Sequence, residues 1–207
     1  MKEGKSSGIA VAVYVAEIPA GIQPKTVYPQ QRAEEIAACG NPRVRQEKYF
    51  AWELLKYAMK HALGLEMEGV QFTKQPSGKW TTPSCCFSIS HSDGMAMVAV
   101  STEEVGVDIE VLDPTKESTL RRVLTVEEKS TIENIPKAQQ LEALTKLWTG
   151  KESVFKAWGK GVFRPASIQV SDYSIESKVE LYAGRLYALS VATERISEIE
   201  WNFVNEI

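Results

Sequence analysis

Two acidic residues, Asp108 and Glu110, stand two positions apart in the segment GVDIE at residues 106–110. This alternation predicts a strand that directs both carboxylates to one face and Val107 and Ile109 to the other. Neighbouring carboxylates repel each other unless a cation lies between them, and hard oxygen ligands suit Mg²⁺. The alternative is a strand with a solvated outer face, where both acids simply meet water.

A third carboxylate, Glu152, and an amine, Lys156, lie four positions apart in WTGKESVFKAWGKG at residues 148–161. Their spacing predicts one face of a helix, and Gly159 and Gly161 indicate where that helix ends. Together with the two strand acids, this pair would suit metal-assisted phosphoryl transfer, with the lysine neutralising or protonating the leaving group. The alternative is an ordinary i,i+4 ion pair on a solvated helix face.

A cluster of hydrogen-bond donors occupies residues 88–92 (SISHS), at the end of a predicted strand. The hydroxyl of Ser90, the imidazole of His91 and the turn amides could bind a phosphate, and Lys79 in the preceding turn could add a cation. The alternative is turn chemistry with an incidental histidine. The sequence has neither a glycine-rich phosphate loop nor a dinucleotide-binding fingerprint, so a nucleotide would be held differently.

The elements that must position these residues are predicted from hydrophobic periodicity and from Gly and Pro breaks. Strands are expected at residues 8–17, 70–73, 86–90, 95–101, 105–111, 167–171, 177–182, 185–193 and 198–204. Helices are expected at residues 34–39, 43–63, 116–132 and 138–159. Asp93-Gly94 lies between two apolar runs and predicts a hairpin.

The two halves of the chain echo each other faintly. Residues 94–102 (GMAMVAVST) and 184–193 (GRLYALSVAT) share a pattern, and each half runs from a strand through helices to further strands. We therefore predict an α+β fold with a pseudo-two-fold arrangement of two similar lobes, residues 1–102 and 103–207. The active site is expected at the interface between these lobes.

Composition argues against several classes of protein. The 207 residues have ordinary hydrophobic and charged fractions, 43% and 25%, and a net charge of −3, which argues against bulk nucleic-acid binding. No segment approaches the ~20 apolar residues of a membrane span. Cys39, Cys85 and Cys86 are expected as reduced thiols, and two histidines, His61 and His91, are too few for a multi-histidine metal site. We expect a cytoplasmic monomer without a nucleic-acid or membrane partner.

The three chemical segments together resemble a known family. Ser90-His91, residues 106–110 and residues 148–161 resemble, in order and spacing, the three motifs of 4'-phosphopantetheinyl transferases. The resemblance is closest to the larger, two-lobed class that includes the surfactin-synthetase activator. It implies a holo-[acyl-carrier-protein] synthase, which moves the 4'-phosphopantetheine arm of coenzyme A onto a serine of an apo acyl or peptidyl carrier protein. Adenosine 3',5'-bisphosphate is the released product.

The resemblance also implies roles for individual residues. Asp108, Glu110 and Glu152 would bind Mg²⁺, or Mn²⁺, against the pyrophosphate of coenzyme A. Glu152 would deprotonate the carrier serine, directly or through a water on the metal, and Lys156 would stabilise or protonate the departing phosphate. These implied roles use both acids of residues 106–110, and Glu152 and Lys156 of residues 148–161.

Contacts to the two substrates are implied by position as well. Ser90, His91 and Lys79 would hold the adenosine-side phosphates of coenzyme A. The helical region after Glu110, with Arg122 and Leu124, would border the carrier-protein docking face.

The sequence departs from the family pattern in two places. The family often has proline after the lysine matched to Lys79, where this chain has Trp80. The basic residues that family members place before and within the first long helix do not align cleanly. The nearby candidates are Arg32, Arg43, Arg45 and Lys48.

Two rival functions share parts of this pattern. Another Mg²⁺-dependent enzyme that cleaves a nucleotide or pyrophosphate would use the same carboxylates without a carrier protein. A non-catalytic coenzyme A or carrier-binding protein would keep the scaffold, although intact Glu152 and Lys156 argue against it.

Overall fold

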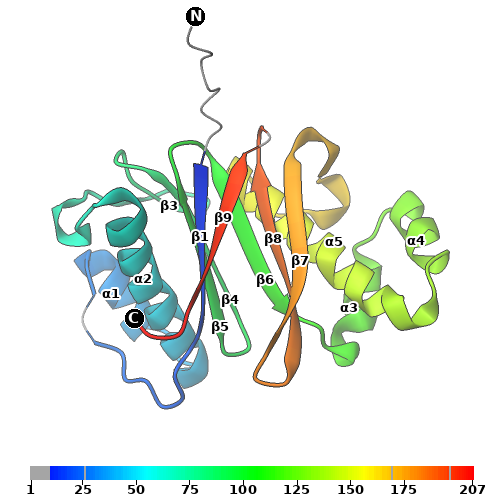
Figure 1. Ribbon diagram of the computed structural model, residues 1–207, viewed down its shortest axis with the longest axis horizontal. Helices are drawn as coiled ribbons and strands as arrows, with labels where there is room; N and C mark the ends of the chain where they lie inside the picture. The colour runs from blue at the N-terminus through cyan, green and yellow to red at the C-terminus, as the bar shows by residue number, and fades with distance from the viewer. Residues whose placement is uncertain (1–9, 26, 169, 196) are drawn as a thin grey trace, which may run out of the picture.

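The structure is a computed structural model that describes residues 10–25, 27–168, 170–195 and 197–207. Two β-sheets form the centre of the molecule, and helices cover both outer sides (Figure 1). The first sheet consists, in spatial order, of β4 (Cys86–Ser92), β5 (Met95–Ser101), β1 (Ala10–Glu17) and β9 (Glu198–Val204). The second consists of β6 (Val105–Val111), β8 (Arg185–Thr193) and β7 (Ser174–Tyr182). A separate two-stranded ribbon is formed by β2 (Thr73–Lys74) and β3 (Trp80–Thr81).

The helices fall into two groups, one against each sheet (Figure 1). α2 (Pro42–Leu63) packs on the first sheet, with α1 (Gln30–Ala37) beside it. α5 (Lys137–Trp158) packs on β6 and β8 of the second sheet, and α3 (Glu117–Arg122) and α4 (Val126–Glu133) pack on α5. Short 3₁₀ turns are η1 (Met67–Gly69), η2 (Pro114–Lys116), η3 (Pro165–Ser167) and η4 (Val170–Asp172). The predicted α+β class is confirmed.

The two sheets pack face to face through a shared apolar core. Alternate residues of β1, β5, β6 and β8 point into it, as the two-residue period of a strand requires. Its buried members are Val11, Val13, Val15, Met95, Met97, Ala99, Val105, Val107, Ile109, Val111, Tyr187, Leu189 and Val191. Burial of each large apolar side chain contributes roughly 1.5–3 kcal/mol. This packing fixes β6 and leaves its other face, with Gly106, Asp108 and Glu110, toward α5.

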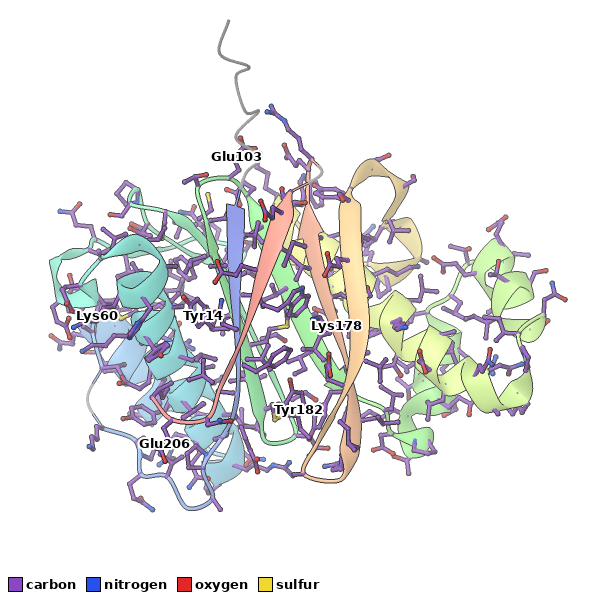
Figure 2. All side chains as sticks on the ribbon, viewed as in Figure 1. Tyr14, Lys60, Glu103, Lys178, Tyr182 and Glu206 are labelled. Carbon is purple, nitrogen blue, oxygen red and sulfur yellow. The ribbon has the colours of Figure 1, made fainter. Side chains whose placement is uncertain are left out.

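The far edges of the two sheets, β9 and β7, are joined by side chains. The ammonium of Lys178 on β7 lies 3.7 Å from the ring centre of Trp201 on β9. The indole N–H of Trp201 donates to Glu176 Oε1 at 2.7 Å. Figure 2 labels Lys178 and Tyr182 of β7, and both side chains contact aromatic rings of β9. The two sheets are therefore held together at β7 and β9 as well as at the β4–β6 contact.

The two sheets are built in the same way. In each, a first strand is followed by helices and then by a hairpin, whose second strand pairs antiparallel with the first strand. The 22-residue helices α2 and α5 both end at a left-handed glycine, Gly64 with φ 65° and Gly159 with φ 68°. The hairpins turn at Asp93-Gly94 and Ala183-Gly184, where all four residues have positive φ.

Among the residues that the structure describes, strand β9 has no counterpart in the second sheet. It comes from the C-terminal half of the chain but pairs in parallel with β1 of the first sheet, with Val13 opposite Trp201. Sheet membership therefore does not follow a single boundary at residue 102. The division into lobes 1–102 and 103–207 stays a prediction.

Most predicted elements agree with the structure. The strand at 105–111 is β6, the hairpin strands are β4 and β5, and the helices at 43–63 and 138–159 are α2 and α5 within one residue at each end. β1 agrees over the residues described; residues 8 and 9 of the predicted strand lie outside them. α2 begins where the sequence is best adapted to begin a helix, because Asn41 caps two backbone N–H groups and Pro42 follows.

Other predicted elements are wrong in detail. The helix expected at 116–132 is divided into α3 and α4, because Thr125 and Glu128 form a capping box that starts a new helix. The described residues of the strand expected at 167–171 lie in and between two 3₁₀ turns. β4 continues through His91 and Ser92, which were expected in the turn.

Two smaller differences remain. The helix expected at 34–39 begins earlier and is α1. Of the strand expected at 70–73, only Thr73 lies in a strand, which is β2. Over the described ranges, no helix combines the length and apolar character that a membrane crossing demands. All three cysteines are free thiols, as predicted.

Candidate active site

The site is built where the edge strands of the two sheets, β4 and β6, meet. Two serines of β4 link the strands: Ser88 Oγ accepts from the Val107 N–H at 3.0 Å, and Ser90 Oγ donates to Asp108 Oδ1 at 2.6 Å. Helix α5 lies directly on β6, because a Cβ at Gly106 would lie 1.8 Å from the Ser153 carbonyl oxygen. The absence of a side chain at this position therefore permits the close approach that brings α5 to the acids.

Lys156 of α5 joins the strand residues into one cluster. Its ammonium donates to Asp108 Oδ1 at 2.7 Å and to Ser90 Oγ at 3.1 Å, and it lies 4.0 Å from Glu152 Oε2. Asp108 is only 5% exposed, so this pairing offsets the cost of burying its charge. The predicted i,i+4 pair is therefore not a solvated surface pair, because its lysine bridges to a buried aspartate.

A cavity of about 270 Å³ opens over this cluster. Its walls are Ile89, Ser90, His91, Asp108, Ile109, Glu110, Trp148, Glu152 and Lys156. Six of the seven residues predicted for the site thus line one cavity, although they come from three separate elements of the chain. Lys79, the seventh, does not line it and lies at a neighbouring cavity.

The charge balance of the cavity perturbs Glu152. Burial raises the pKa of its carboxyl to about 7, and although Lys156 opposes this shift, the negative charges of Asp108 and Glu110 add to it. Glu110 in turn pairs with Lys116 of η2. Three carboxylates thus share a site in which lysines supply the counter-charge.

The donor set fits a hard divalent cation. The available ligands are carboxylate oxygens, which Mg²⁺ prefers. Burial raises the pKa of Glu152, and the repulsion from Asp108 and Glu110 that adds to this shift would be relieved by a cation. As the side chains stand, no three His, Cys, Asp or Glu residues in the described part of the chain are grouped as ligands for one metal ion. Asp108 and Glu110 are turned to Lys156 and Lys116 instead, so metal binding would require these two pairs to open.

A second cavity, of about 300 Å³, adjoins the first. It shares Ile89, His91 and Lys156 with the first cavity. Four cationic side chains line it: Arg32, Lys48, Lys79 and Lys156. We call it the cationic cavity. Its charge suits an anionic ligand such as a phosphate.

The structure separates the four basic candidates near the first long helix. Arg32 and Lys48 line the cationic cavity. Arg43 pairs with Glu47 and Asp93, and the Arg45 guanidinium donates to the Cys39 carbonyl at 2.7 and 2.9 Å, so neither is directed to the cavity.

Arg32 is held rigidly in the wall of this cavity. Its guanidinium lies 4.9 Å from the ring centre of Trp52 and 3.1 Å from Glu35 Oε2. Burial lowers the pKa of Arg32, and Glu35 opposes that shift. Its Nε is the one buried side-chain donor among the described residues without a protein partner. A cation held in this way is ready to receive an anionic ligand.

Glu47 is a site residue that sequence reasoning missed. It projects from α2, is largely buried, and its Oε2 lies 3.1 Å from His91 Nδ1. The hydrogen bond with His91 lowers the pKa of Glu47, and Arg43 adds to the effect. Glu47 therefore orients the imidazole that both cavities share. The only sequence signal was an acid on the buried side of an amphipathic helix.

Lys151, next to Glu152 in the third motif, has a different place. It is 1% exposed, and its ammonium lies 2.6 Å from Glu128 Oε1 and donates to the Pro165 carbonyl at 2.8 Å. Glu128 also caps the start of α4. Lys151 therefore ties α5 to α4 and to the following loop, and does not line the cavity.

Comparison with known proteins supports the resemblance. Residues 104–194 match the sequence model of the 4'-phosphopantetheinyl transferase superfamily. These residues make up less than half of the chain, and over them it is similar to that superfamily. They contain β6, α5 and the β7–β8 hairpin, and therefore Asp108, Glu110, Glu152 and Lys156.

Individual relatives carry the same description. The chain is 29% identical over 127 residues to 4'-phosphopantetheinyl transferase HetI of Nostoc sp.. The aligned region covers 57% of this chain and 54% of that protein. It is 31% identical over 128 residues to a 4'-phosphopantetheinyl transferase of Bacillus subtilis, 60% of this chain and 55% of the relative. To 4'-phosphopantetheinyl transferase Sfp of Bacillus subtilis strain 168 it is 29% identical over 115 residues, 54% of this chain and 51% of the relative. The chain thus spans about half the length of these relatives.

Proposed function

We propose that this protein transfers the 4'-phosphopantetheine arm of coenzyme A to a serine of an apo carrier protein. The observation that carries the proposal is the cluster of Asp108, Lys156 and Ser90, with Glu152 beside it, at the edge of a cationic cavity. The superfamily match over residues 104–194 supports the same reaction.

The reaction assigns a task to each end of the cluster. The oxygen of the carrier serine forms a bond to the phosphorus that bears the pantetheine arm, and the bond from that phosphorus to the adenosine-side phosphate oxygen breaks. Glu152, as carboxylate, accepts the serine proton. Lys156 lies one helical turn from Glu152 and stabilises or protonates the departing phosphate of adenosine 3',5'-bisphosphate.

The acids would hold a divalent ion. Asp108, Glu110 and Glu152 are the residues that would bind Mg²⁺ or Mn²⁺. When bound, the ion would neutralise the charge of the coenzyme A pyrophosphate. The protein's own contribution is to keep the three carboxylates on one cavity wall and to hold Lys156 within reach of Asp108.

The cationic cavity would receive the adenosine-side phosphates. Ser90 and His91 border the acid cluster, and His91 and Lys79 both line the cationic cavity. Arg32 and Lys48 add charge from the first sheet's helices. The position of Glu47 behind His91 supports a phosphate-binding role, since it fixes the ring that would donate to the anion.

We also propose that the two sheet-and-helix units form two lobes related by a pseudo-two-fold. Their shared order of strand, 22-residue helix and hairpin supports this arrangement. The echo between residues 94–102 and 184–193 falls on equivalent strands, β5 and β8. The site between β4 and β6 would then lie at the junction of the lobes. A cytoplasmic monomer without nucleic-acid or membrane partners stays a prediction.

The carrier protein would dock beside α3 and α4. Arg122 is exposed there, but Leu124, which was expected at the docking face, is buried with Leu120, Ile132 and Leu144. Val126, at the start of α4, is 78% exposed and offers apolar surface in its place.

The direct test is incubation with coenzyme A, Mg²⁺ and a panel of apo fatty-acid, polyketide and peptide carriers, followed by intact mass. The proposal requires a carrier to gain the phosphopantetheine mass. Coenzyme A cleavage without a carrier would indicate another Mg²⁺-dependent enzyme. Binding of coenzyme A or carrier without turnover would indicate a non-catalytic binding protein.

A further inference from the structure

Lys79 is held in place by residues distant in the sequence. The next residue, Trp80, is buried in the apolar core between α2 and the first sheet. Its ring lies 5.7 Å from that of Trp52, and its indole N–H donates to Glu35 Oε2 at 3.2 Å. Adjacent side chains in an extended segment point to opposite sides. The burial of Trp80 therefore directs Lys79 outward, toward the end of α5.

The ammonium of Lys79 has two partners there. It donates to Glu104 Oε2 at 2.7 Å and to the Ala157 carbonyl at 3.3 Å. The carbonyl end of a helix attracts a cation. Gly159 leaves room for the lysine chain, since a Cβ at this position would lie 2.8 Å from Lys79 Cδ. Lys79 is thus clamped between the turn before β6 and the C-terminus of α5.

This clamp lies on the boundary between two cavities. Lys79 lines the cationic cavity and also a third cavity of about 370 Å³ on the other side of it. Of these two cavities, Glu104 lines the third and not the cationic one, and the half-exposed Trp158 lines the third with it. Glu104 therefore compensates the charge of Lys79 from the third cavity, whereas Arg32, Lys48 and Lys156 line the cationic cavity.

We propose that Glu104 is a counter-charge that competes with the substrate's phosphate for Lys79 and so sets the affinity for coenzyme A. This inference rests on the proposed function, in which Lys79 meets an adenosine-side phosphate. A phosphate entering the cationic cavity must draw the ammonium away from a carboxylate at hydrogen-bond distance. Glu104 therefore compensates the charge of Lys79 in the empty cavity, as Glu35 does for Arg32 and Asp108 for Lys156, and in doing so it weakens anion binding.

The chain provides a matched control beside Glu104. Glu103 also lies in the turn between β5 and β6, at the upper end of the sheets in Figure 2, and its side chain is 44% exposed against 52% for Glu104. Its nearest cation is Arg195 at 3.9 Å. Glu103→Gln and Glu104→Gln remove the same charge from adjacent positions, so only the contact with Lys79 distinguishes them.

The test is isothermal titration of the full chain with coenzyme A and with adenosine 3',5'-bisphosphate, without a carrier. We expect Glu104→Gln to bind both about twofold to fivefold more tightly than wild type, the range of a partly exposed ion pair. The gain should shrink at high salt. Glu103→Gln should bind like wild type.

A second pair of variants isolates the contact. In the Lys79→Met background, adding Glu104→Gln should change neither affinity, because the cation for which Glu104 competes is gone. A gain that persists without Lys79, or a Glu104→Gln protein that binds no more tightly than Glu103→Gln, would overturn the inference. If wild type binds neither ligand, the proposed function fails together with this inference. Binding without a gain refutes the counter-charge alone.

Discussion

Helices α2 and α5 have the same length and the same kind of C-terminus, but they bury different chemistry. The buried residues of α2 are almost all apolar: Tyr49, Phe50, Ala51, Trp52, Leu54, Leu55, Ala58 and Met59, with Glu47 the one charged exception. The buried residues of α5 include Thr149, Lys151 and Ser153. Helix α2 therefore mainly stabilises an apolar core. Helix α5 uses its buried polar residues to fix the position of the face that carries Glu152 and Lys156.

The way each helix meets its sheet explains the difference. Large side chains separate α2 from its sheet. In contrast, α5 approaches β6 so closely that only a glycine, Gly106, fits beneath it. Close approach brings the polar side chains of α5 to hydroxyls of the sheet, as in the 2.7 Å contact between Thr149 Oγ1 and Ser190 Oγ. A helix held in this way places Glu152 and Lys156 with little freedom.

The largest expected effect is a loss of activity without a loss of stability, on removal of a carboxylate from the site. Asp108→Ala and Glu152→Ala should reduce carrier modification by about three to four orders of magnitude, because each removes a carboxylate of the cluster. Intact-mass assays measure the loss, and circular dichroism should show an unchanged fold. By contrast, Leu54→Ala in α2 should lower the free energy of unfolding by about 2–5 kcal/mol and leave the rate per folded molecule unchanged. Full activity in both carboxylate variants would refute the proposed site.

The next effect tests the close approach of α5. Gly106→Ala should destabilise the protein by about 3–4 kcal/mol, because its Cβ would overlap backbone atoms of Ser153 and Ala157. Gly150→Ala is the control, since its Cβ would meet Ile175 at an ordinary 3.8 Å and alanine favours a helix. Urea unfolding compares the two. Equal stabilities would show that α5 does not rest on β6 as described.

A pH effect tests the burial of Glu152 beside the other two acids. The pKa of Glu152 is raised from its usual 4.5 to about 7, so between these values the folded state binds a proton that the unfolded state lacks. Stability of the metal-free protein should therefore fall as pH rises from about 4.5 to 7, by on the order of 3 kcal/mol. Denaturation in a chelator at several pH values measures this. Glu152→Gln should lack this part of the pH dependence, and an identical profile in both proteins would contradict the assignment.

The smallest effect concerns helix starts. The Asn41 side chain accepts from two N–H groups of α2, whereas Pro136 before α5 provides no side-chain cap. Asn41→Ala should lower the free energy of unfolding by about 1 kcal/mol, and Asn41→Asp should retain most of it. Thermal unfolding would detect the difference. No loss in the alanine variant would mean that packing alone fixes the start of α2.

Local patterns were enough to predict much of the fold. The alternation of Val105, Val107 and Ile109 gave β6 and placed both acids on one face, because a strand has no other way to bury those residues. The break between α3 and α4 was missed although Thr125 and Glu128 carry the capping-box spacing. Residues on both sides of this box form helices, so the box is the local signal that separates α3 from α4.

Other parts of the site depend on contacts that no local pattern contains. Ser90 meets Asp108 only because β4 and β6 become neighbouring edges. His91 of β4 meets Glu47 only because α2 packs on the first sheet. The burial of Lys151 could not be read from a segment rich in charge, since its partner Glu128 belongs to another helix. Motif resemblance predicted which residues gather, but not which of them would pair.

The parallel pairing of β9 with β1 has a consequence for how the chain folds. Ala10 lies opposite Glu198, so the first sheet is completed by residues that leave the ribosome long after its other strands. Until then β1 is an open edge that another chain could pair with. Contacts this distant in sequence also slow folding. Arrival of β9 therefore ends the period in which a newly made molecule is most prone to aggregate.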